Sequence, residues 1–586
     1  MKNNIYKFFT MLFVASTFYA CENDLLNTLP YNRVGSEAMW TTESMTDLGL
    51  VGVYQTLRNN HVGLHQWQLD QYSVSTMNRD IQALVGGNIT SGNVLFSDYW
   101  KQHYEGIHRA NNAVMNIEKV SPLTPEKKGR LLAESKFLRA FFYFNLNQVY
   151  KGVPVYLEPV SLEQLTRGRE TEDAVWEIII QDLSDCINEP NFPDIYVKGN
   201  VGHGRASKSA AYALRGKAYM WLKKYSEAEA DFKEVEKRGA SLYQGEYKQL
   251  FKEANEQHAE MIFSVQNIGI SGLGSDIQLR LGTRSSFGSC WNTFLAHPDF
   301  VESFENKDGS AFDWETYLPG YNSLTPSQRT VYFLRNNITE SEIKVFESRG
   351  ANMSLYLPNG NEERIRQAYE NRDPRLTSLI ITPYSQYVGY VNNASTAVTL
   401  RWPYRVENQA PFDLRTDSNT KFYYLWRKWV AEGGSEIPNR AYCPTDQPLI
   451  RYADVLLLLA EAINEQGFAQ EAIDMVNLIR TRVGVPPLQS TDASLPTYVS
   501  TQENMRERIR NERRWELALE GQSFFDELRW GTWREQKFAP GNGIKEIWGT
   551  VTAPYSWGGE HFYKWAIPQK EIEMNRNIIQ NEGWIN

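Results

Sequence analysis

His61 and His65 lie four residues apart, a spacing that could hold a metal ion. On a helix, this spacing would place both imidazole rings on one face. Asn59 and Asn60 precede the pair, Gly63 interrupts it, and no acidic residue stands nearby to complete a ligand set. We therefore expect an ordinary polar loop around these histidines, and no metal site.

Motifs for covalent or phosphate chemistry are absent from the sequence. It contains no G-x-S-x-G nucleophile elbow, Walker loop, H-E-x-x-H pair or EF-hand spacing. Its 70 Asp and Glu residues are too numerous to single out the two carboxylates of a glycosidase. A hydrolase is thus unsupported, and we expect no enzyme.

The composition narrows the class of protein. The chain has 586 residues, a formal net charge of −9 and 13% aromatic residues. This negative balance disfavours a nucleic-acid partner, because phosphate binding requires clustered Lys and Arg. Four Cys in so long a chain, without a C-x-x-C pair, cannot form a disulfide scaffold. At 42% hydrophobic residues the chain is too apolar to be disordered, so we expect a large globular protein.

The first twenty residues indicate export. Lys2 and Lys7 precede an uncharged run, residues 8–20, which ends in a small residue directly before Cys21. This arrangement is typical of a secretory signal, here residues 1–20. The run is shorter than the ~20 residues of a membrane-spanning helix. It resembles a bacterial lipoprotein signal, which implies lipid on Cys21; ordinary export with a free thiol is the alternative.

Apolar residues at helical spacing indicate paired helices in the rest of the chain. Residues 206–239 contain two apolar stripes separated by a turn. Ser226 and Glu229 are spaced as a capping box for the second helix, and Gly239 closes it. A second pair covers residues 449–482, and both have about the size of a tetratricopeptide unit. Further helices are expected at 102–119, 131–149, 172–187 and 503–520.

Between the helices lie long segments rich in Gly, Asn, Ser, Pro, Tyr and Trp, with little periodicity. Long irregular segments in a compact protein usually serve function. We therefore predict a single domain after the signal, residues 21–586, in which a helical frame carries a loop-rich functional face. The expected parts are a tether at 21–35, a frame at about 36–59, 101–240 and 449–530, and the loop-rich face at about 60–100, 265–447 and 535–565.

Seven segments, in order from residue 100 to the C-terminus, together resemble the SusD/RagB-type surface lipoproteins of Bacteroidetes. They are LRAFFYF (138–144) with GVP (152–154), RDPR (372–375), IRYADVLLLLAEA (450–462), NLIRTR (477–482), RNERRWE (510–516) with FD (525–526), and parts of 100–111 and 567–581. Most of these segments belong to the expected frame. They therefore indicate fold and family without indicating the ligand.

The resemblance implies a mainly α fold of tetratricopeptide-like helix pairs with a large loop-rich glycan-binding face. It also implies a protein held at the outer membrane through lipid on Cys21 and exposed at the cell surface. Such a protein captures an oligo- or polysaccharide and delivers it to a SusC-like TonB-dependent transporter without cleaving it. No cofactor is expected, although family analogy allows calcium.

A sugar ring has apolar C–H faces and a polar edge. A glycan site therefore requires exposed flat aromatic rings together with Asn, Asp or Arg side chains that reach the hydroxyls. In the family, the glycan face is built from the early loop and the irregular middle of the chain. In those regions we expect ligand binding by Trp67, Tyr72, Asn78, Arg79, Trp291, Asn292, Trp314 and Tyr321. For each ring, a place in the core is the alternative, and we expect core positions for Trp402, Trp426, Trp429, Trp515, Trp530 and Trp565.

Two other functions stay open at this point. The same anchored frame could grip a peptide or protein on a concave helical surface. Failure to bind any member of a broad glycan panel would favour this alternative. The third candidate, a hydrolase, would shorten a recognised glycan on incubation.

Overall fold

The structure is a computed structural model that describes residues 39–161, 164–405, 407, 409–418 and 420–585. The predicted signal peptide, Cys21 and the 21–35 tether lie outside the described residues. The described chain is mostly helical with several small β-sheets, which confirms the predicted mainly α class. None of its helices combines the length and the apolar character needed to cross a bilayer.

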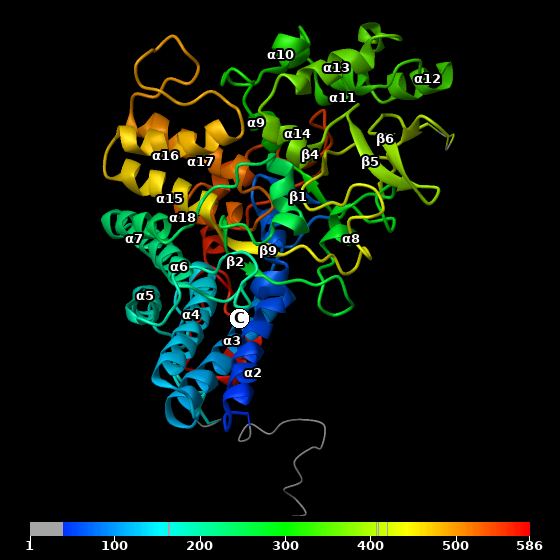
Figure 1. Cartoon of the computed structure of the whole chain (residues 1–586). Coiled ribbons are helices and arrows are strands. Elements are labelled where there is room, and N and C mark those ends of the chain that lie inside the picture. The colour runs from blue at the N-terminus through cyan, green and yellow to red at the C-terminus, as the bar shows by residue number, and fades with distance from the viewer. Residues whose placement is uncertain (1–38, 162–163, 406, 408, 419, 586) are drawn as a thin grey trace, which may run out of the picture.

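The frame is a series of helices in which each packs against the next. Its members are α2 (Glu43–Tyr54), α3 (Val94–Lys119), α4 (Pro125–Tyr150), α5 (Glu172–Asn188), α6 (Lys208–Trp221), α7 (Tyr225–Lys237), α15 (Tyr452–Glu465), α16 (Gln470–Arg482) and α17 (Gln502–Glu516). The chain leaves this series after α7 and returns with α15, which packs directly against α7. Figure 1 shows α4 to α7 and α15 to α17 along one side of the molecule.

Short polar side chains start several of these helices. The Ser207 side chain accepts a hydrogen bond from the backbone N–H of Ala210 and caps α6. Thr124 caps α4 in the same way, and Pro125 follows it at the first helical position, where its fixed φ suits the helix. Because these signals act within four residues, the sequence alone reveals them.

The start of α7 differs from the expected one. Its N-cap is Lys224, which makes no side-chain capping bond, so the predicted capping box of Ser226 and Glu229 is wrong. The helix begins before Ser226, which therefore lies inside the first turn and not at the cap. The predicted closing glycine is confirmed, since Gly239 has a φ of +93° and its N–H bonds to the carbonyl of Glu236.

Gly216 allows a close approach between α6 and α7. A Cβ at this position would lie 2.4 Å from the ring of Phe232, which is buried. Gly216→Ala is therefore expected to lower the free energy of unfolding by about 1–3 kcal/mol. The matched control is Gly52→Ala in α2, where nothing lies within 4 Å of the added Cβ; it is expected to raise the free energy by about 0.5–1 kcal/mol. Urea unfolding measures both changes, and changes of the same sign would contradict the packing argument.

The other half of the molecule, around residues 240–447, consists of short helices and small sheets. Its helices are α8 (Ile277–Leu281), α9 (Pro298–Ser303), α10 (Trp314–Tyr317), α11 (Pro326–Arg329), α12 (Glu340–Ser348), α13 (Asn361–Glu370) and α14 (Pro374–Leu379). Its strands are β2 (Met261–Val265), β3 (Phe294–Ala296), β4 (Ile380–Ile381), β5 (Gln386–Val391), β6 (Ala394–Thr399), β7 (Phe412–Asp413) and β8 (Leu425–Trp426). In Figure 1 this loop-rich half lies opposite α15 to α17.

Further elements complete the chain. The early strand β1 (Thr76–Asn78) pairs with β3, and β9 (Gln447–Arg451) pairs with β2. The remaining elements are α18 (Ser523–Trp530), α19 (Trp533–Lys537), β10 (Gly543–Lys545), β11 (Val551–Pro554) and α20 (Gln569–Met574). In the β2–β9 pair, Met261 lies opposite Arg451 and Val265 opposite Gln447. The loop-rich half therefore leaves the frame and rejoins it at one place.

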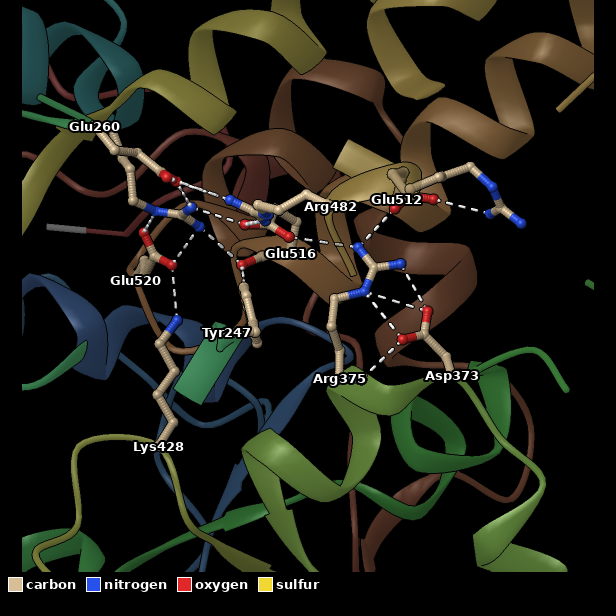
Figure 2. Close-up of polar contacts among 11 residues, drawn as sticks. Tyr247, Glu260, Asp373, Arg375, Lys428, Arg482, Glu512, Glu516 and Glu520 are labelled. Carbon is tan, nitrogen blue, oxygen red and sulfur yellow. Dashed lines mark hydrogen bonds and ion pairs between the residues drawn. The ribbon is translucent and has the colours of Figure 1, made fainter. Parts of the chain in front are cut away.

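A buried network of ion pairs lies near this junction (Figure 2). Arg451, at the end of β9, contacts Glu516 at 2.7 Å, Glu520 at 2.8 Å and Glu260. Lys428 from the loop-rich half also contacts Glu520, at 2.7 Å. All five side chains are buried, and Arg482, whose side chain is 2% exposed, contacts Glu516 at 2.6 Å and Glu260 at 3.2 Å. Three cations therefore balance the three carboxylates in place of water.

The network continues into α14 and α16. Arg375 contacts Asp373 at 2.7 Å and Glu512 at 2.6 Å, and Arg480 contacts Glu512 at 3.1 Å. Asp373, Arg375, Arg451, Arg480, Glu512 and Glu516 come from the segments 372–375, 450–462, 477–482 and 510–516, which carried the resemblance in the sequence. The family-like segments therefore fasten the frame to the loop-rich half.

Candidate functional site

Four of the predicted ligand-binding rings lie in the interior. Trp67, Tyr72, Trp314 and Tyr321 are 4%, 5%, 4% and 2% exposed. Trp67 packs edge-on against Phe294, with 4.9 Å between ring centroids, and Trp314 stacks on Tyr321 at 5.1 Å. The loop-rich half has only short helices, so Trp67, Trp314 and Tyr321 fill its core, whereas Tyr72 belongs to the core of the frame. Enclosed rings cannot lie against a sugar, and we correct these four from ligand-facing to core positions.

Core positions were expected for six other tryptophans. Five of them are buried, as predicted: Trp402, Trp426, Trp429, Trp515 and Trp565. Trp530 is half-buried: it donates its indole N–H to Glu461 at 2.9 Å and lies under the guanidinium of Arg510. None of the six is therefore a candidate for stacking on a ligand.

Trp291 differs from the other predicted rings, because 43% of its surface is exposed. It lies in the loop between α8 and β3, where Gly288 turns the chain with a φ of +82°. The N–H of Trp291 donates to the carbonyl of Leu279 at 2.9 Å, and that of Asn292 donates to Gly282 at 2.7 Å. Backbone hydrogen bonds at and beside Trp291 thus hold its indole at the surface.

Arg79 follows β1 and lies beside Trp291. Its Nη1 donates to the carbonyl of Trp291 at 3.1 Å, and its backbone N–H donates to Thr293 at 2.8 Å. The same Nη1 contacts the carboxylate of Asp417, which also accepts from Nε of Arg284 at 2.9 Å. Segments after β1, after α8 and after β7 therefore converge on Asp417.

The shared carboxylate is the electrostatic centre of this arrangement. Partial burial of Asp417 favours its neutral form, but the hydrogen bonds from Arg284 and Arg79 outweigh this and lower its pKa. The group is therefore ionised at neutral pH and holds both guanidinium groups in place. The side chains of Arg79 and Arg284 keep 26% and 38% of their surface exposed, which leaves them accessible to a ligand.

The two predicted asparagines position the loops. Asn292 is buried, has a φ of +38°, and accepts a hydrogen bond from the N–H of Asp417 at 2.7 Å. Asn78 donates to Gln71 at 3.0 Å and accepts from the N–H of Asp80 at 3.0 Å. Asn78 is thus engaged within the protein, and Asn292 is buried, with Oδ1 bonded and no hydrogen-bond partner for Nδ2 among the described residues. Trp291 and Arg79 are the predicted residues that remain accessible together.

Sequence reasoning missed three neighbours of Trp291. Arg284 stands in the same loop, and its charge and nearness in sequence could have been noticed. Asp417 and Arg440 come from distant segments; Nη1 of Arg440 donates to the carbonyls of the 288–289 turn. No spacing in the sequence links these segments. We call the following set the Trp291 surface: Trp291, Arg79, Asp80, Arg284, Asp417 and Arg440.

The histidine pair does not lie in the expected loop, because Asn60–Leu64 form a short π-helix that ends at His65. Only His65 contacts a carboxylate. Nε2 of His65 lies 2.7 Å from a carboxylate oxygen of Asp276, while His61 stays apart from that contact. Among the residues that the structure describes, no group of three or more His, Cys, Asp or Glu side chains is placed to hold a metal ion.

A separate hollow of about 520 Å³ lies between α9, the segment 311–312 and α17. Its lining is mostly polar and includes Glu305, Tyr498 and Arg508. The ring of Phe312 at its edge is covered by the guanidinium of Arg372, 3.5 Å from the ring centroid. The hollow therefore offers a weaker platform for a sugar than Trp291 does.

Two family models match the chain. The model described as the SusD family matches residues 259–584. A second model, described as "Starch-binding associating with outer membrane", matches residues 24–220. The two matches together include most of the frame and of the loop-rich half.

Individual proteins are similar over most of their length. SusD-like protein P25 of Formosa agariphila is 23% identical over 591 residues, which is 98% of this chain and 97% of that protein. The starch-binding protein SusD of Bacteroides thetaiotaomicron is 23% identical over 489 residues, 80% of this chain and 75% of that protein. A solved SusD-like carbohydrate-binding protein of Bacteroides fragilis superposes with a TM-score of 0.71 at 23% identity, covering 92% and 99% of the two chains.

Proposed function

Because the chain belongs to the SusD family, we propose that it binds glycans at the outer membrane without cleaving them. Lipid on Cys21 anchors it at the cell surface, and it passes captured oligo- or polysaccharide to a SusC-like TonB-dependent transporter. Binding requires no cofactor. The matched model whose description joins starch binding to the outer membrane supports this proposal, as does the starch-binding relative.

The observation that carries the proposal is the exposed indole of Trp291 beside two arginines. A sugar ring stacked on this indole hides roughly 60–80 Å² of apolar area, which contributes about 1.5–2 kcal/mol. Guanidinium groups of Arg79 and Arg284 donate to hydroxyl oxygens, and the carboxylate of Asp417 accepts from hydroxyl hydrogens. After the entropy of association is subtracted, such contacts give a Kd between about 1 mM and 1 μM. That range suits a protein that captures cargo and then releases it.

Trp291→Ala tests the proposal directly. Wild-type protein is expected to bind at least one member of a panel of polysaccharides in affinity electrophoresis and calorimetry. Loss of the stacking platform is expected to raise the Kd about 10–30-fold. The control is Phe468→Ala in the turn between α15 and α16, whose ring is similarly exposed but lies outside the Trp291 surface. This control is expected to bind as the wild type does.

Two results would overturn parts of the proposal. Absence of binding to every polysaccharide in the panel would favour the peptide- or protein-binding alternative for the same frame. Shortened products after incubation with a bound glycan, detected by chromatography, would show that the protein is an enzyme.

A further inference from the structure

The Trp291 surface carries more positive than negative charge, although the whole chain has a formal net charge of −9. Among the residues that the structure describes, Arg79, Arg284 and Arg440 form ion pairs with only two carboxylates, those of Asp80 and Asp417. Asp80 lies 3.9 Å from Arg79 and its side chain is 76% exposed, so water screens it strongly. The positive excess is therefore local to this surface and does not follow from composition.

Charged residues next to the Trp291 surface do not neutralise its excess of positive charge. Arg280 is balanced by Asp276 at 2.7 Å, in an ion pair of its own. Arg415 hydrogen-bonds through its backbone N–H to Ser285, in the loop that carries Trp291, and makes no ion pair among the described residues. Its guanidinium donates to the carbonyl of Arg405 and lies 5.7 Å from the ring centroid of Tyr404, so it is not counted in the charge of the Trp291 surface.

Several guanidinium N–H groups of this surface remain available. Arg79 uses Nη1, Arg284 uses Nε and Nη2, and Arg440 uses Nη1. Within the described residues, Nη2 of Arg79, Nη1 of Arg284, and Nε and Nη2 of Arg440 make no hydrogen bond to protein. Arg284 is exposed, and Arg79 and Arg440 are half-exposed. The arginines are thus fixed by one part of each guanidinium and offer the other part to a ligand.

These arginines offer more hydrogen-bond donors and more positive charge than a neutral sugar requires. Hydroxyl groups are satisfied by amides, carboxylates and single donors. Paired guanidinium donors match the two oxygens of a carboxylate or a sulfate, and the resulting bonds are stronger than those to neutral groups. A net positive surface also raises the local concentration of anions.

We propose that the glycan bound at the Trp291 surface is anionic, with a sugar ring on Trp291 and its carboxylate or sulfate groups on Arg284 and Arg440. This inference rests on the proposed function and adds the class of the ligand. Carboxylate and sulfate share the oxygen geometry that a guanidinium recognises, so the test must separate them.

The test compares matched polymers that differ only in charge. Polygalacturonate is paired with its methyl-esterified form for carboxylate, and dextran sulfate with dextran for sulfate. The full chain is expected to bind the charged member of at least one pair about tenfold more tightly at low ionic strength. The preference is expected to vanish near 1 M NaCl, where the screening length is about 3 Å.

Substitutions test whether the Trp291 surface causes the preference for the charged polymer. Arg440→Gln is expected to reduce binding of the charged polymer about five- to tenfold and to leave binding of the neutral partner unchanged. Arg284→Gln is expected to reduce binding of the charged polymer by the same factor and binding of the neutral partner by a smaller one, because Arg284 also donates to hydroxyl groups. Trp291→Ala is expected to weaken both members alike. Arg534→Gln is the control, since it removes an exposed arginine of α19, which pairs with Glu560 and lies outside this surface.

The outcomes separate the two claims. Equal Kd values for charged and neutral members, both weakened by Trp291→Ala, would overturn the anionic inference and leave glycan binding intact. Binding to neutral polymers alone would do the same. Absence of binding to all four polymers and to a wider neutral panel would overturn the proposed function itself.

Discussion

Replacing Arg451 by methionine is expected to lower the free energy of unfolding by about 3–5 kcal/mol. Arg451 is 1% exposed and contacts Glu260, Glu516 and Glu520. Figure 2 shows these carboxylates gathered at the junction of the two halves. The substitution removes one of the cations that balance these three buried carboxylates. Leaving a buried charge without its partner costs far more free energy than the ion pair contributed to stability.

Urea unfolding followed by tryptophan fluorescence measures this change. Arg534→Met is the matched control, because its ion pair with Glu560 is largely exposed, and we expect a change within about 0.5 kcal/mol. Adding Glu520→Gln to Arg451→Met is expected to recover part of the loss, since it removes one of the uncompensated charges. A change below about 1 kcal/mol for Arg451→Met would contradict the importance of the network.

Acid is expected to weaken the protein strongly between about pH 4.5 and pH 2. Burial alone would raise the pKa of Glu516, but Arg482 and Arg451 outweigh it and lower the pKa to about 2. Asp454, held chiefly by Lys217, also has a pKa of about 2 despite its burial. Since both folded-state values lie below those of the unfolded chain, their stabilisation is complete above about pH 4.5 and disappears as the pH falls through 2. Together they contribute on the order of several kcal/mol.

The pH range in which Glu516 and Asp454 act separates their effect on stability from that of buried carboxylates whose pKa is raised. Burial raises the pKa of Asp70 and of Glu527 to about 7, so their contribution decreases as the pH rises between about 4 and 7. Urea midpoints measured at about pH 4.5, 3 and 2 therefore report Glu516 and Asp454 together with other carboxylates whose pKa is lowered, such as Asp413 and Glu461, and the Gln variant isolates the share of Glu516. Glu516→Gln is expected to show a shallower slope in this window, and the exposed Glu347→Gln on α12 the wild-type slope. Parallel slopes for wild type and Glu516→Gln would refute the assignment.

The frame could be predicted from the sequence because its signals are local. The predicted pairs at 206–239 and 449–482 contain α6 with α7 and α15 with α16. Their boundaries failed where a distant contact decides the conformation. Residues 449–451 belong to β9, because they pair with β2, and α17 ends at Glu516 before Leu519 takes a φ of +62°. Neither the strand partner nor the turn has a signature within a few residues.

The site was less predictable, because exposure of a ring depends on what covers it. In the sequence, Trp67 and Trp291 both lie in polar, glycine-containing segments, and nothing in their neighbours along the chain distinguishes them. In the fold, Phe294 packs on Trp67, whereas backbone hydrogen bonds hold Trp291 outward. Asp417 and Arg440 reach Trp291 only through the path of the chain in the loop-rich half. The types of side chain that a glycan site needs could be predicted from chemistry, but which residues the fold brings together could not.

Since β2 and β9 lie side by side, residues 266–446 form an excursion whose two ends meet. Changes of length within that excursion add little closure entropy and do not displace the frame helices. Arg284, Trp291, Asp417 and Arg440 all belong to it. Ligand preference can therefore diverge among descendants of one ancestor by exchange of these loops, while the helical part is inherited unaltered.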